Sequence, residues 1–448
     1  MNKNKYEIDM CNGSIMDKLI SFALPLMLSG ILQLMFNAVD IIVVGHFSNS
    51  QALAAVGSTT ALINVFVNLF IGVSLGTNVL AARCYAAGKD KEMSEVVHTS
   101  ILFALISGIV MAIIGVLLAK PALQLMQTPA DVIDQSALYM RIYFLGMPFF
   151  MLYNYGAAVL RAVGDTKRPL MYLILSGIVN TLLNLFLVIV FRLAVAGVAI
   201  STIIAQCISC ILILNCLRKS ESSYKLTFSG LSIKWVYLRQ IFQVGIPAGI
   251  QSTVINFSNA LLQSSVNSFG STAMAGYTAA NNILGFLYAS VNAVTQACMS
   301  FTSQNFGVGK YKRVDLVLRD CMILTVGVSL VLGGGAYLFG NEVLRIYTND
   351  SEVVRCGVEI LSITTVPYFL CGIMDLFPGS LRGMGYSTVP MILSVVGTVG
   401  MRIFWIYRVF PFHRSLYVLF ISYPASWTFT IIMQVICFIC VRKIVNRR

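Results

Sequence analysis

Residues 160–166 read Leu160-Arg161-Ala162-Val163-Gly164-Asp165-Thr166, and a proline follows at position 169. The same pattern returns 221 residues later as Leu381-Arg382-Gly383-Met384-Gly385-Tyr386-Ser387, with Pro390 after it. Further pairs at an offset of 221 or 222 extend the match: Gly88-Lys89 with Gly309-Lys310, Leu123 with Leu344, Val132 with Val353, and Pro25 with Pro247. The chain is therefore a tandem duplication of two related halves.

The composition places both halves in a membrane. Hydrophobic residues make up 57% of the 448 residues, charged residues only 11%, and the mean hydropathy is +0.81. An ordinary soluble protein is about one-quarter charged, so this chain cannot cover a soluble surface. The net charge of +13 would suggest nucleic-acid binding in a soluble protein, but cytoplasmic loops of membrane proteins collect Lys and Arg without binding anything. We therefore expect a polytopic membrane protein with no nucleic-acid partner.

The apolar runs predict the number of spans, because a helix needs about 20 apolar residues to cross a bilayer core about 30 Å thick. Twelve such runs are present, at approximately residues 19–45, 52–80, 97–119, 138–160, 168–191, 193–216, 236–265, 273–300, 321–340, 357–381, 386–409 and 416–441. The predicted fold is an all-α membrane protein of twelve transmembrane helices in two six-helix lobes. Because six is even, the lobes have parallel topology and are related by a pseudo-two-fold axis along the membrane normal. The predicted lobes are residues 1–217 and 236–448, joined by a polar, basic cytoplasmic linker at residues 218–235.

The basic residues set the predicted orientation. With the N-terminus inside, 23 of the 31 lysines and arginines fall in inner segments, as the positive-inside rule requires. These segments include Lys3 and Lys5, the cluster Arg218–Arg239 and the tail Arg442–Arg448. The first run is too long for the core of a signal peptide and lacks a small-residue cleavage site. We expect a multi-pass protein of the cell inner (plasma) membrane with both termini in the cytoplasm.

Several short motifs give no support for catalysis or metal binding. The pairs Cys207/Cys210 and Cys437/Cys440 have the spacing of zinc ligands, but they lie in apolar runs with no histidine or acid nearby, which indicates packing. Gly72–Gly76 matches GxSxG without the strand-turn-helix context of a nucleophile elbow. The three histidines have no metal spacing, and no P-loop is present. We expect no enzyme activity and no cofactor.

Acidic residues within the membrane are more informative, since a carboxyl group there is costly and usually faces a cavity, a partner or an ion path. Sixteen of the eighteen acids fall in loops or near helix ends, which leaves Asp40 and Asp375 well within spans. Asp40 ends a polar stripe with Ser29, Gln33 and Asn37, whose spacings of 4, 4 and 3 residues place them on one face of the first helix. A polar packing seam between helices is the alternative role, and the cost of a buried charge weighs against it.

Three more polar residues of the N-terminal lobe reach the depth of Asp40. Asn180 and Asn184 lie one turn apart on one face of the fifth span, and Thr202 lies in the sixth. Counted from the outer ends of their spans, the four side chains lie roughly 7 to 17 Å deep, so they can meet in the outer half of the lobe. A desolvated carboxyl group can carry a proton, while a carboxylate with amide and hydroxyl oxygens can hold sodium. Asn and Thr alone commonly join helices, so the assignment depends on Asp40.

The C-terminal lobe keeps its charges at other positions. At the offset of the repeat, Leu262 matches Asp40, Asn259 matches Asn37 and Asp375 matches Asn154. Arg402 is a candidate partner of Asp375, but Asp375 lies near the inner end of its span and Arg402 near the outer end, which argues against a direct ion pair. The residues that we assign to substrate binding or conformational change are Gln33, Asn37, Asn154, Asn259 and Asp375.

The sequence resembles the multidrug and toxic compound extrusion (MATE) family, in its bacterial branch related to DNA-damage-inducible efflux proteins. The resemblance covers nearly the whole chain, and the residues that carry it are Pro25 and Asp40-Ile41-Ile42-Val43-Val44-Gly45, the loops Ala86-Ala87-Gly88-Lys89 and Phe306-Gly307-Val308-Gly309-Lys310, and the duplicated Leu-Arg-x-x-Gly segments. Their order and two-fold spacing make the match specific. The resemblance implies a V-shaped transporter that exports organic cations, drugs and other toxic compounds in exchange for inward sodium or protons.

The resemblance also implies a coupling-ion site. In such relatives the N-terminal lobe binds the ion through an aspartate of the first helix, an asparagine and an acid one turn apart in the fifth, and a threonine in the sixth. Asp40, Asn180 and Thr202 match this pattern, whereas Asn184 stands where the second acid is expected. One carboxylate fewer leaves the ion open between a lone proton and a weakly held sodium ion, and no other metal is expected. A glutamate that another branch places in the seventh helix is missing here.

We therefore expect a secondary active antiporter that works by alternating access and acts as a monomer among membrane lipids. The alternative is a lipid-linked oligosaccharide flippase of the same wider superfamily, which would need more cationic residues in its central cleft to bind pyrophosphate. An intramembrane enzyme would need a nucleophile and a base, or metal ligands, at one depth, and the sequence offers none.

Overall fold

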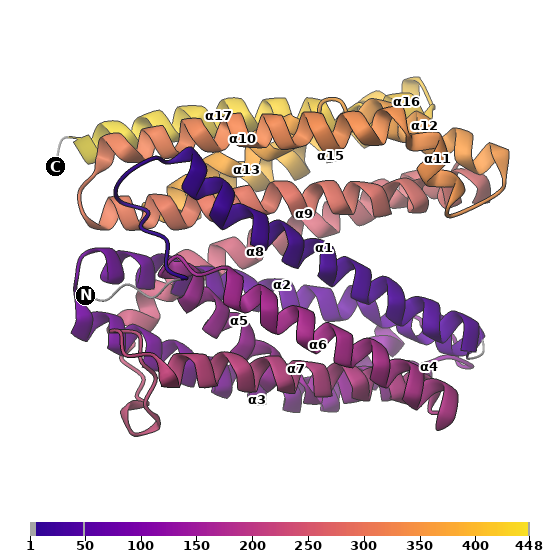
Figure 1. Ribbon diagram of the computed structural model, residues 1–448. Coiled ribbons are helices and arrows are strands. Elements are labelled where there is room, and N and C mark those ends of the chain that lie inside the picture. The colour runs from indigo at the N-terminus through magenta and orange to yellow at the C-terminus, as the bar shows by residue number, and fades with distance from the viewer. Residues whose placement is uncertain (1–5, 48–49, 447–448) are drawn as a thin grey trace. The chain divides into compact units, whose positions relative to one another are not determined.

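The computed structural model of the chain describes residues 6–47 and 50–446. Within those ranges the chain forms helices and connecting loops without β-strands, so the predicted all-α class is confirmed (Figure 1). Lys3 and Lys5 of the predicted cytoplasmic N-terminus and the last two arginines of the C-terminal tail lie outside the described residues.

By packing, the described residues fall into two units. Unit 1 consists of residues 6–8 and Ile31–Ile246, and unit 2 consists of Asp9–Gly30 and residues 247–446. The chain therefore changes unit within the first helix of each half. The predicted lobes divide the chain by counting spans and not by packing, so their boundaries stay a prediction.

Unit 1 contains six predicted spans, and each coincides with helix. Its helices are α1 (Met16–Phe47, from Ile31 onward), α2 (Ser50–Ala86), α3 (Asp90–Leu125), α4 (Ile133–Leu145), α5 (Met147–Ala162), α6 (Lys167–Leu185) with the π-helix η1 (Phe186–Val190), α7 (Ala194–Lys219), and the first part of α8 (Trp235–Asn267). Helices α4 and α5 form one span with a 46° bend. Pro148 lies in the first turn of α5, where its missing N–H favours a break in the helix.

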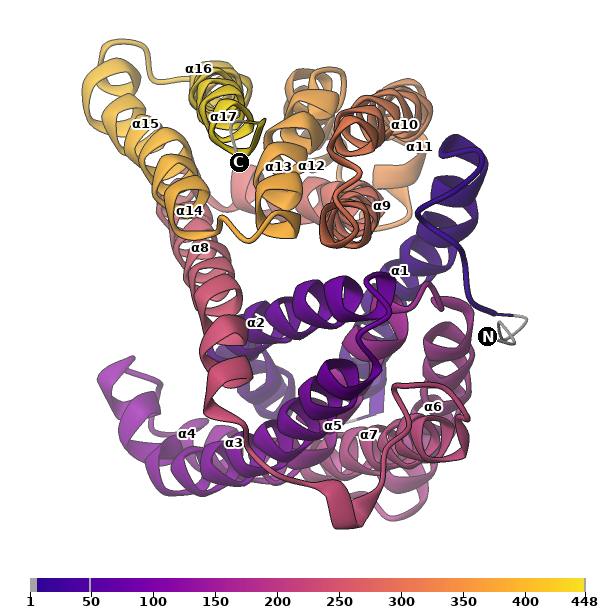
Figure 2. The ribbon, with the colours of Figure 1, turned by 90° about the vertical axis from the view of Figure 1, so that its left-hand side faces the viewer.

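Unit 2 contains the remaining spans. Its helices are the first part of α1, the rest of α8, α9 (Ser271–Gly307), α10 (Tyr311–Leu338), α11 (Gly340–Arg345), α12 (Ser351–Thr364), α13 (Tyr368–Gly383), α14 (Thr388–Ser394), the π-helix η3 (Val395–Gly400), α15 (Met401–Phe404), the π-helix η4 (Trp405–Val409), the 3₁₀-helix η5 (Phe410–Phe412), α16 (Leu416–Phe420) and α17 (Ser422–Asn446). Helices α12 and α13 form a second bent span of 51°, with Pro367 at the break. Figure 2 views α9, α10 and α17 nearly end-on.

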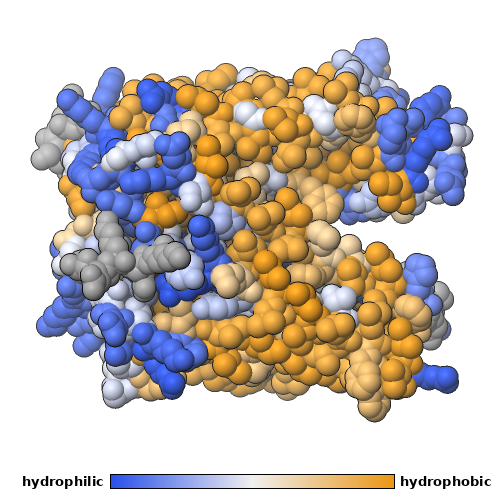
Figure 3. All heavy atoms as spheres, in the orientation of Figure 1, coloured by the Kyte–Doolittle hydropathy of each residue, from blue (hydrophilic) through white to orange (hydrophobic). Residues whose placement is uncertain are grey.

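The hydropathy of these helices agrees with the predicted spans. Across the described residues, nine helices are long and apolar enough to cross a membrane, and the two bent pairs raise this number to eleven. Helix α8, which is 33 residues long, coincides with the seventh predicted run. Hydrophobic residues cover the middle of the helices in Figure 3, and hydrophilic residues gather at their ends. The prediction of twelve transmembrane helices is confirmed.

The duplicated motif forms matching turns in the two units. Gly164 and Gly385 both have positive φ, at 96° and 85°, and so do Gly88 and Gly309, at 66° and 72°. Glycine adopts this conformation without steric cost, because it has no Cβ. At Gly164 a Cβ would also lie 2.5 Å from the backbone oxygen of Ile8 in the same unit. The repeated glycines are therefore required by the backbone of these turns.

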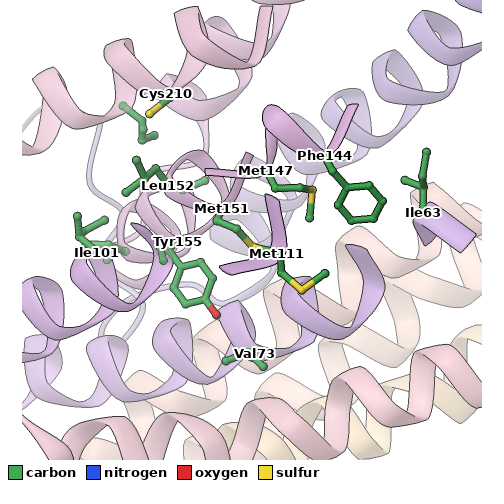
Figure 4. Packing of buried hydrophobic residues seen from close by; sticks show 14 of the residues in the cluster. Ile63, Val73, Ile101, Met111, Phe144, Met147, Met151, Leu152, Tyr155 and Cys210 are labelled. Atoms are coloured by element: carbon green, nitrogen blue, oxygen red, sulfur yellow. The ribbon is translucent and has the colours of Figure 1, made fainter. Parts of the chain in front are cut away.

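Large flexible and aromatic side chains fill the interior of unit 1. Met147, Met151 and Tyr155 of α5 are buried and line up along one face of the helix (Figure 4). The ring of Phe144 packs against Gly115 of α3 so closely that a Cβ there would overlap it. Such contacts fix the spacing of the helices, since a packed interior leaves little room for added atoms.

The linker between the two halves is fastened to unit 1. Nε2 of His98, on α3, accepts a hydrogen bond from the backbone N–H of Thr227 at 3.1 Å, and Nδ1 lies 2.7 Å from the backbone oxygen of Ser94. The neighbouring Thr99 donates to the Ser232 oxygen and accepts from the Lys234 N–H. The segment before α8 is therefore held on the first turns of α3.

Candidate ion-coupling site

The four residues predicted to form the ion site come together in unit 1. Asn184, on α6, donates from Nδ2 to Oδ1 of Asp40, on α1, and to Oδ1 of Asn180 at 2.8 Å. Nδ2 of Asn180 lies 3.5 Å from Oγ1 of Thr202, on α7. The two asparagines are buried, and Asp40 and Thr202 are partly buried. One chain of polar contacts therefore joins three membrane-spanning helices.

Ser201 completes this group and was not predicted from the sequence. The side chain is fully buried, and its Oγ donates to Oδ1 of Asn184. It lies next to Thr202, so a helix of 3.6 residues per turn directs the two hydroxyl groups about 100° apart. Both can still reach the asparagines of α6, because these occupy two successive turns. The only indication in the sequence was that this serine stands next to Thr202, which was predicted for the site. We call Asp40, Asn180, Asn184, Ser201 and Thr202 the Asp40 cluster.

A side-chain contact between α1 and α6 lies one turn before Asp40 and Asn180. Gly177 lies one turn before Asn180, and the ring of Phe36, one turn before Asp40, occupies the space that a Cβ of Gly177 would take. With a larger residue at 177, the Phe36 ring would have to take another position or the two helices would have to separate. Glycine here therefore positions the site, although it carries no polar group.

The helix geometry changes beside the site. The π-helix η1 begins at Phe186, two residues after Asn184, and the N–H of Phe191 bonds to the oxygen of Phe186. A π-turn is a local insertion that often marks functional sites. It alters the helix register directly after Asn184.

Two tyrosines of α4 lie within the electrostatic reach of Asp40. Tyr139 and Tyr143 both interact with its charge, and Tyr143 is hydrogen-bonded to Gln206, one turn beyond Thr202. The carboxylate therefore has phenol and amide groups around it but no lysine or arginine among the groups that act on it in the described residues.

The rest of the predicted polar stripe on α1 does not join the Asp40 cluster. Gln33 and Asn37 are exposed, and Ser29 donates to the backbone oxygen of Pro25 within its own helix. Asn154, on α5, likewise donates to the oxygen of Phe150, one turn away. A substrate-binding role for Gln33, Asn37 and Asn154 stays a prediction.

In unit 2, the predicted residues lie in two separate groups. Oδ1 of Asn259, on α8, accepts a hydrogen bond from Arg402 of α15 at 2.7 Å. Asp375, on α13, interacts electrostatically with Arg382 and with Tyr288. The described residues contain no ion pair between Asp375 and Arg402, as the depths of the two residues predict. Asp375 and Arg402 therefore interact with different neighbours.

The Asp40 cluster combines one carboxylate with two amides and two hydroxyl groups. This set can accept a proton at Asp40 or offer oxygen atoms to a small monovalent cation. The part of the chain that is described contains no group of three or more His, Cys, Asp or Glu side chains arranged for a metal ion. The cluster thus places a group that can take up one positive charge at the contact between α1 and α6.

The family of the chain follows from its two halves. A sequence model of the MatE family matches residues 25–186 and matches again over residues 247–407. The chain belongs to the MatE family. Its two matches start 222 residues apart, at 25 and 247, and end 221 apart, at 186 and 407, so the family model reproduces the internal repeat.

Relatives of this MatE protein are named as multidrug resistance and multidrug export proteins. The chain is 28% identical over 423 residues to the probable multidrug resistance protein YoeA of Bacillus subtilis (strain 168), covering 92% of this chain and 91% of YoeA. It is 23% identical over 385 residues to the multidrug export protein MepA of Staphylococcus aureus (strain NCTC 8325 / PS 47), covering 84% of each. A crystal structure of MATE in complex with MaL6 superimposes with a TM-score of 0.93 at 19% identity, covering 100% of both chains. The protein is a multi-pass membrane transporter of the MATE multidrug efflux family.

Proposed function

We propose that this MatE protein is a secondary active antiporter that exports organic cations and drugs in exchange for inward protons. The observation that carries the proposal is the Asp40 cluster, in which one carboxylate is held by the amide of Asn184 between transmembrane helices. The multidrug names of YoeA and MepA supply the substrate class.

The hydrogen bonds around Asn184 favour a proton over sodium. Its amide nitrogen faces the Asp40 carboxylate, and its oxygen accepts from Ser201. A sodium ion would need oxygen atoms from these groups, so the amide would have to turn and give up both contacts. A proton needs only the carboxylate. The absence of a second acid at position 184 points the same way, because one charge matches one proton.

Protonation of Asp40 would act directly on the contact between α1 and α6. A hydrogen bond to a carboxylate is roughly twice as strong as one to a neutral acceptor, so a proton on Asp40 weakens its bond to Asn184. The outer part of α1 then loses one of its polar contacts with α6. In the cycle that we propose, this change rearranges the N-terminal lobe of the outward-open state, expels the substrate and permits return to the inward-open state.

The buried arginines support export of drugs over the flippase alternative. A flippase would present cationic side chains to a pyrophosphate group. Arg402 is instead held by Asn259, and Arg382 donates to Oε1 of Gln251 at 2.6 Å. Each guanidinium group therefore donates to an amide oxygen within unit 2.

The remaining parts of the proposal concern the membrane location, the topology and the oligomeric state. We propose an inner (plasma) membrane location with both termini in the cytoplasm, since 23 of the 31 basic residues then fall on the cytoplasmic side. We also propose that the transporter acts as a monomer, because both halves of the repeat are present in one chain.

The test is efflux of a fluorescent organic cation such as ethidium from proteoliposomes, with pH and sodium gradients imposed separately. We expect the pH gradient to drive efflux and Asp40→Asn to abolish this response. Asp134→Asn is the matched control, because this acid is exposed at the surface and forms an ion pair with Lys120. Efflux that responds to the sodium gradient alone would identify sodium, not the proton, as the coupling ion. Efflux that responds to neither gradient would contradict the proposed antiport.

A further inference from the structure

A polar cavity lies at one end of the helix pair α6 and α7 in unit 1. The two helices pack side by side (Figure 1 and Figure 2), and a cavity of about 320 Å³ lies where α6 begins and α7 ends. The polar residues that line it are Arg168, Tyr172, Asn215, Cys216, Lys219 and Ser220. Arg168 and Cys216 also mark the inner ends of two predicted spans, residues 168–191 and 193–216. The cavity therefore lies at the predicted boundary between the membrane and the cytoplasm.

Both charged residues that line this cavity are cations. They are Arg168 and Lys219, and no acid is among the lining residues. The nearest acids in the chain are Asp165, a buried carboxylate that pairs with Arg168, and Glu221, an exposed residue beyond the end of α7. Lys219 forms no ion pair among residues 6–47 and 50–446. The lining therefore carries an unbalanced positive charge, which favours an anionic ligand.

Two side chains of α7 offer N–H groups to a ligand in the cavity. Asn215 and Lys219 lie one turn apart, so the helix places them on the same face. Within the described ranges neither makes a side-chain hydrogen bond. The amide and ammonium groups are therefore available to an acceptor such as a phosphate oxygen.

Arg168 is oriented by contacts with its neighbours. Its Nε donates to the carboxylate of Asp165, its Nη1 to Sγ of Cys216 at 3.0 Å, and its Nη2 to the hydroxyl of Tyr224 at 3.4 Å. Tyr224 in turn donates to Glu7 at 2.7 Å. A guanidinium has five N–H groups, so two remain after these three contacts. Arginine is well suited to phosphate, because its planar group can donate two parallel hydrogen bonds.

An apolar stripe continues from the cavity along α7. Lys219, Asn215, Ile211 and Ile204 follow one another at spacings of 4, 4 and 7 residues, which places them on one face of the helix. Both isoleucines are exposed. A ligand whose headgroup occupies the cavity can therefore lay a hydrocarbon chain along this stripe. A free phosphate compound has no chain to place there, so the stripe favours a phospholipid.

We propose that this cavity binds the headgroup of an anionic phospholipid, whose phosphate is held by Arg168, Asn215 and Lys219. Basic pockets between transmembrane helices are a recurring form of lipid site, and the cytoplasmic leaflet carries the negative surface potential that such pockets match. The inference goes beyond the proposed antiport and does not depend on it. A lipid bound here joins α6 and α7, which contribute four of the five residues of the Asp40 cluster.

The first test measures binding of dioctanoyl-phosphatidylglycerol, a short-chain anionic phospholipid, to the purified full-length protein in neutral detergent by native mass spectrometry. We expect one tightly bound lipid per chain. Binding to Lys219→Gln should be about tenfold weaker, because a charge-assisted hydrogen bond is lost. Arg218→Gln is the matched control, since it removes the same charge from a neighbouring exposed residue that does not line the cavity.

Three outcomes of this measurement would overturn the inference. They are no binding of the lipid to the wild type, an unchanged affinity in Lys219→Gln, and an equal loss of affinity in Arg218→Gln. Each of them would remove the cavity from lipid recognition.

Two further ligands separate the headgroup from the chains. Glycerol 3-phosphate has the anionic group without acyl chains, and dioctanoyl-phosphatidylcholine has the chains without a net charge. We expect both to bind more weakly than dioctanoyl-phosphatidylglycerol. Equally tight binding of glycerol 3-phosphate would make this a site for free phosphate compounds and not for lipid. Equally tight binding of the phosphatidylcholine would show that the positive charge of the cavity does not select the ligand.

The second test locates the lipid through Cys216, which lines the cavity. Alkylation by N-ethylmaleimide is followed for each cysteine by peptide mass spectrometry, without lipid and with dioctanoyl-phosphatidylglycerol at about ten times its Kd. At that concentration about one site in ten stays empty, so alkylation of Cys216 should slow about tenfold. Cys356, which is partly buried in unit 2, should react at an unchanged rate. Alkylation of Cys216 at the same rate with and without lipid would contradict the proposed site.

Discussion

Replacement of Gly177 by alanine tests how the Asp40 cluster is positioned. An alanine Cβ at 177 would overlap the ring of Phe36, the residue that packs one turn before Asp40 on α1. Relief requires the Phe36 ring to leave this position or α1 and α6 to separate, and both changes alter the packing one turn from Asp40 and Asn180. We expect Gly177→Ala to be less stable than the wild type and to lose the hydrogen bond between Asn184 and Asp40.

The expected change in the free energy of unfolding of Gly177→Ala is the sum of two opposing contributions. Overpacking an interior costs about 1–3 kcal/mol, while replacing glycine by alanine within a helix gains about 1 kcal/mol. A net loss of about 1 kcal/mol remains for Gly177→Ala. Gly57, on α2, has no atom within 4 Å of a Cβ added to it. Gly57→Ala should therefore show only the stabilisation of about 1 kcal/mol from replacing glycine in a helix. The two glycine-to-alanine variants should therefore differ by about 2 kcal/mol.

Thermal unfolding in detergent and pH-driven ethidium efflux in vesicles measure the two consequences. Gly177→Ala should melt below the wild type and transport poorly, whereas Gly57→Ala should melt at or above it. Phe36→Leu in the Gly177→Ala background removes the overlapping ring and should restore part of both properties. Equal melting of the two alanine variants, or unimpaired efflux in Gly177→Ala, would refute the argument that this close approach positions Asp40.

Three further substitutions test other contacts. Ser201→Ala leaves Oδ1 of Asn184 without its donor at a cost of about 1–3 kcal/mol, so efflux should require a steeper pH gradient; an unchanged gradient dependence would remove Ser201 from the site. Asn184→Asp adds the second acid that the MATE pattern contains, and sodium should then drive efflux, which a sodium gradient without a pH gradient checks. His98→Ala frees Thr227, so trypsin should cut the linker at Lys225 or Lys234 faster than in the wild type, and equal digestion would show that His98 does not fasten it.

The sequence predicts the spans well, because the hydropathy of each run can be evaluated without knowing how the helices pack. All twelve runs coincide with helices, and the depth of each polar residue within its run was enough to predict that Asp40, Asn180, Asn184 and Thr202 meet. The same reasoning separated Asp375 from Arg402. These predictions need only the rise per residue and the cost of burying polar groups.

Properties that depend on side-chain direction and packing were not predictable. Ser201 was missed because neighbouring residues on a helix point in different directions, and nothing in the sequence says which of two hydroxyl groups reaches Asn184. The role of Gly177 depends on the ring of Phe36, 141 residues away in the chain.

The central claim is that substrate and proton move in opposite directions through Asp40, and the most direct test drives the exchange from the substrate side. Proteoliposomes containing a pH-sensitive dye are loaded with ethidium and diluted into medium of the same pH without ethidium. Efflux of the cation should draw protons inward and acidify the interior, and Asp40→Asn should show no acidification. Wild-type efflux without any internal pH change, or acidification that persists in Asp40→Asn, would contradict the account.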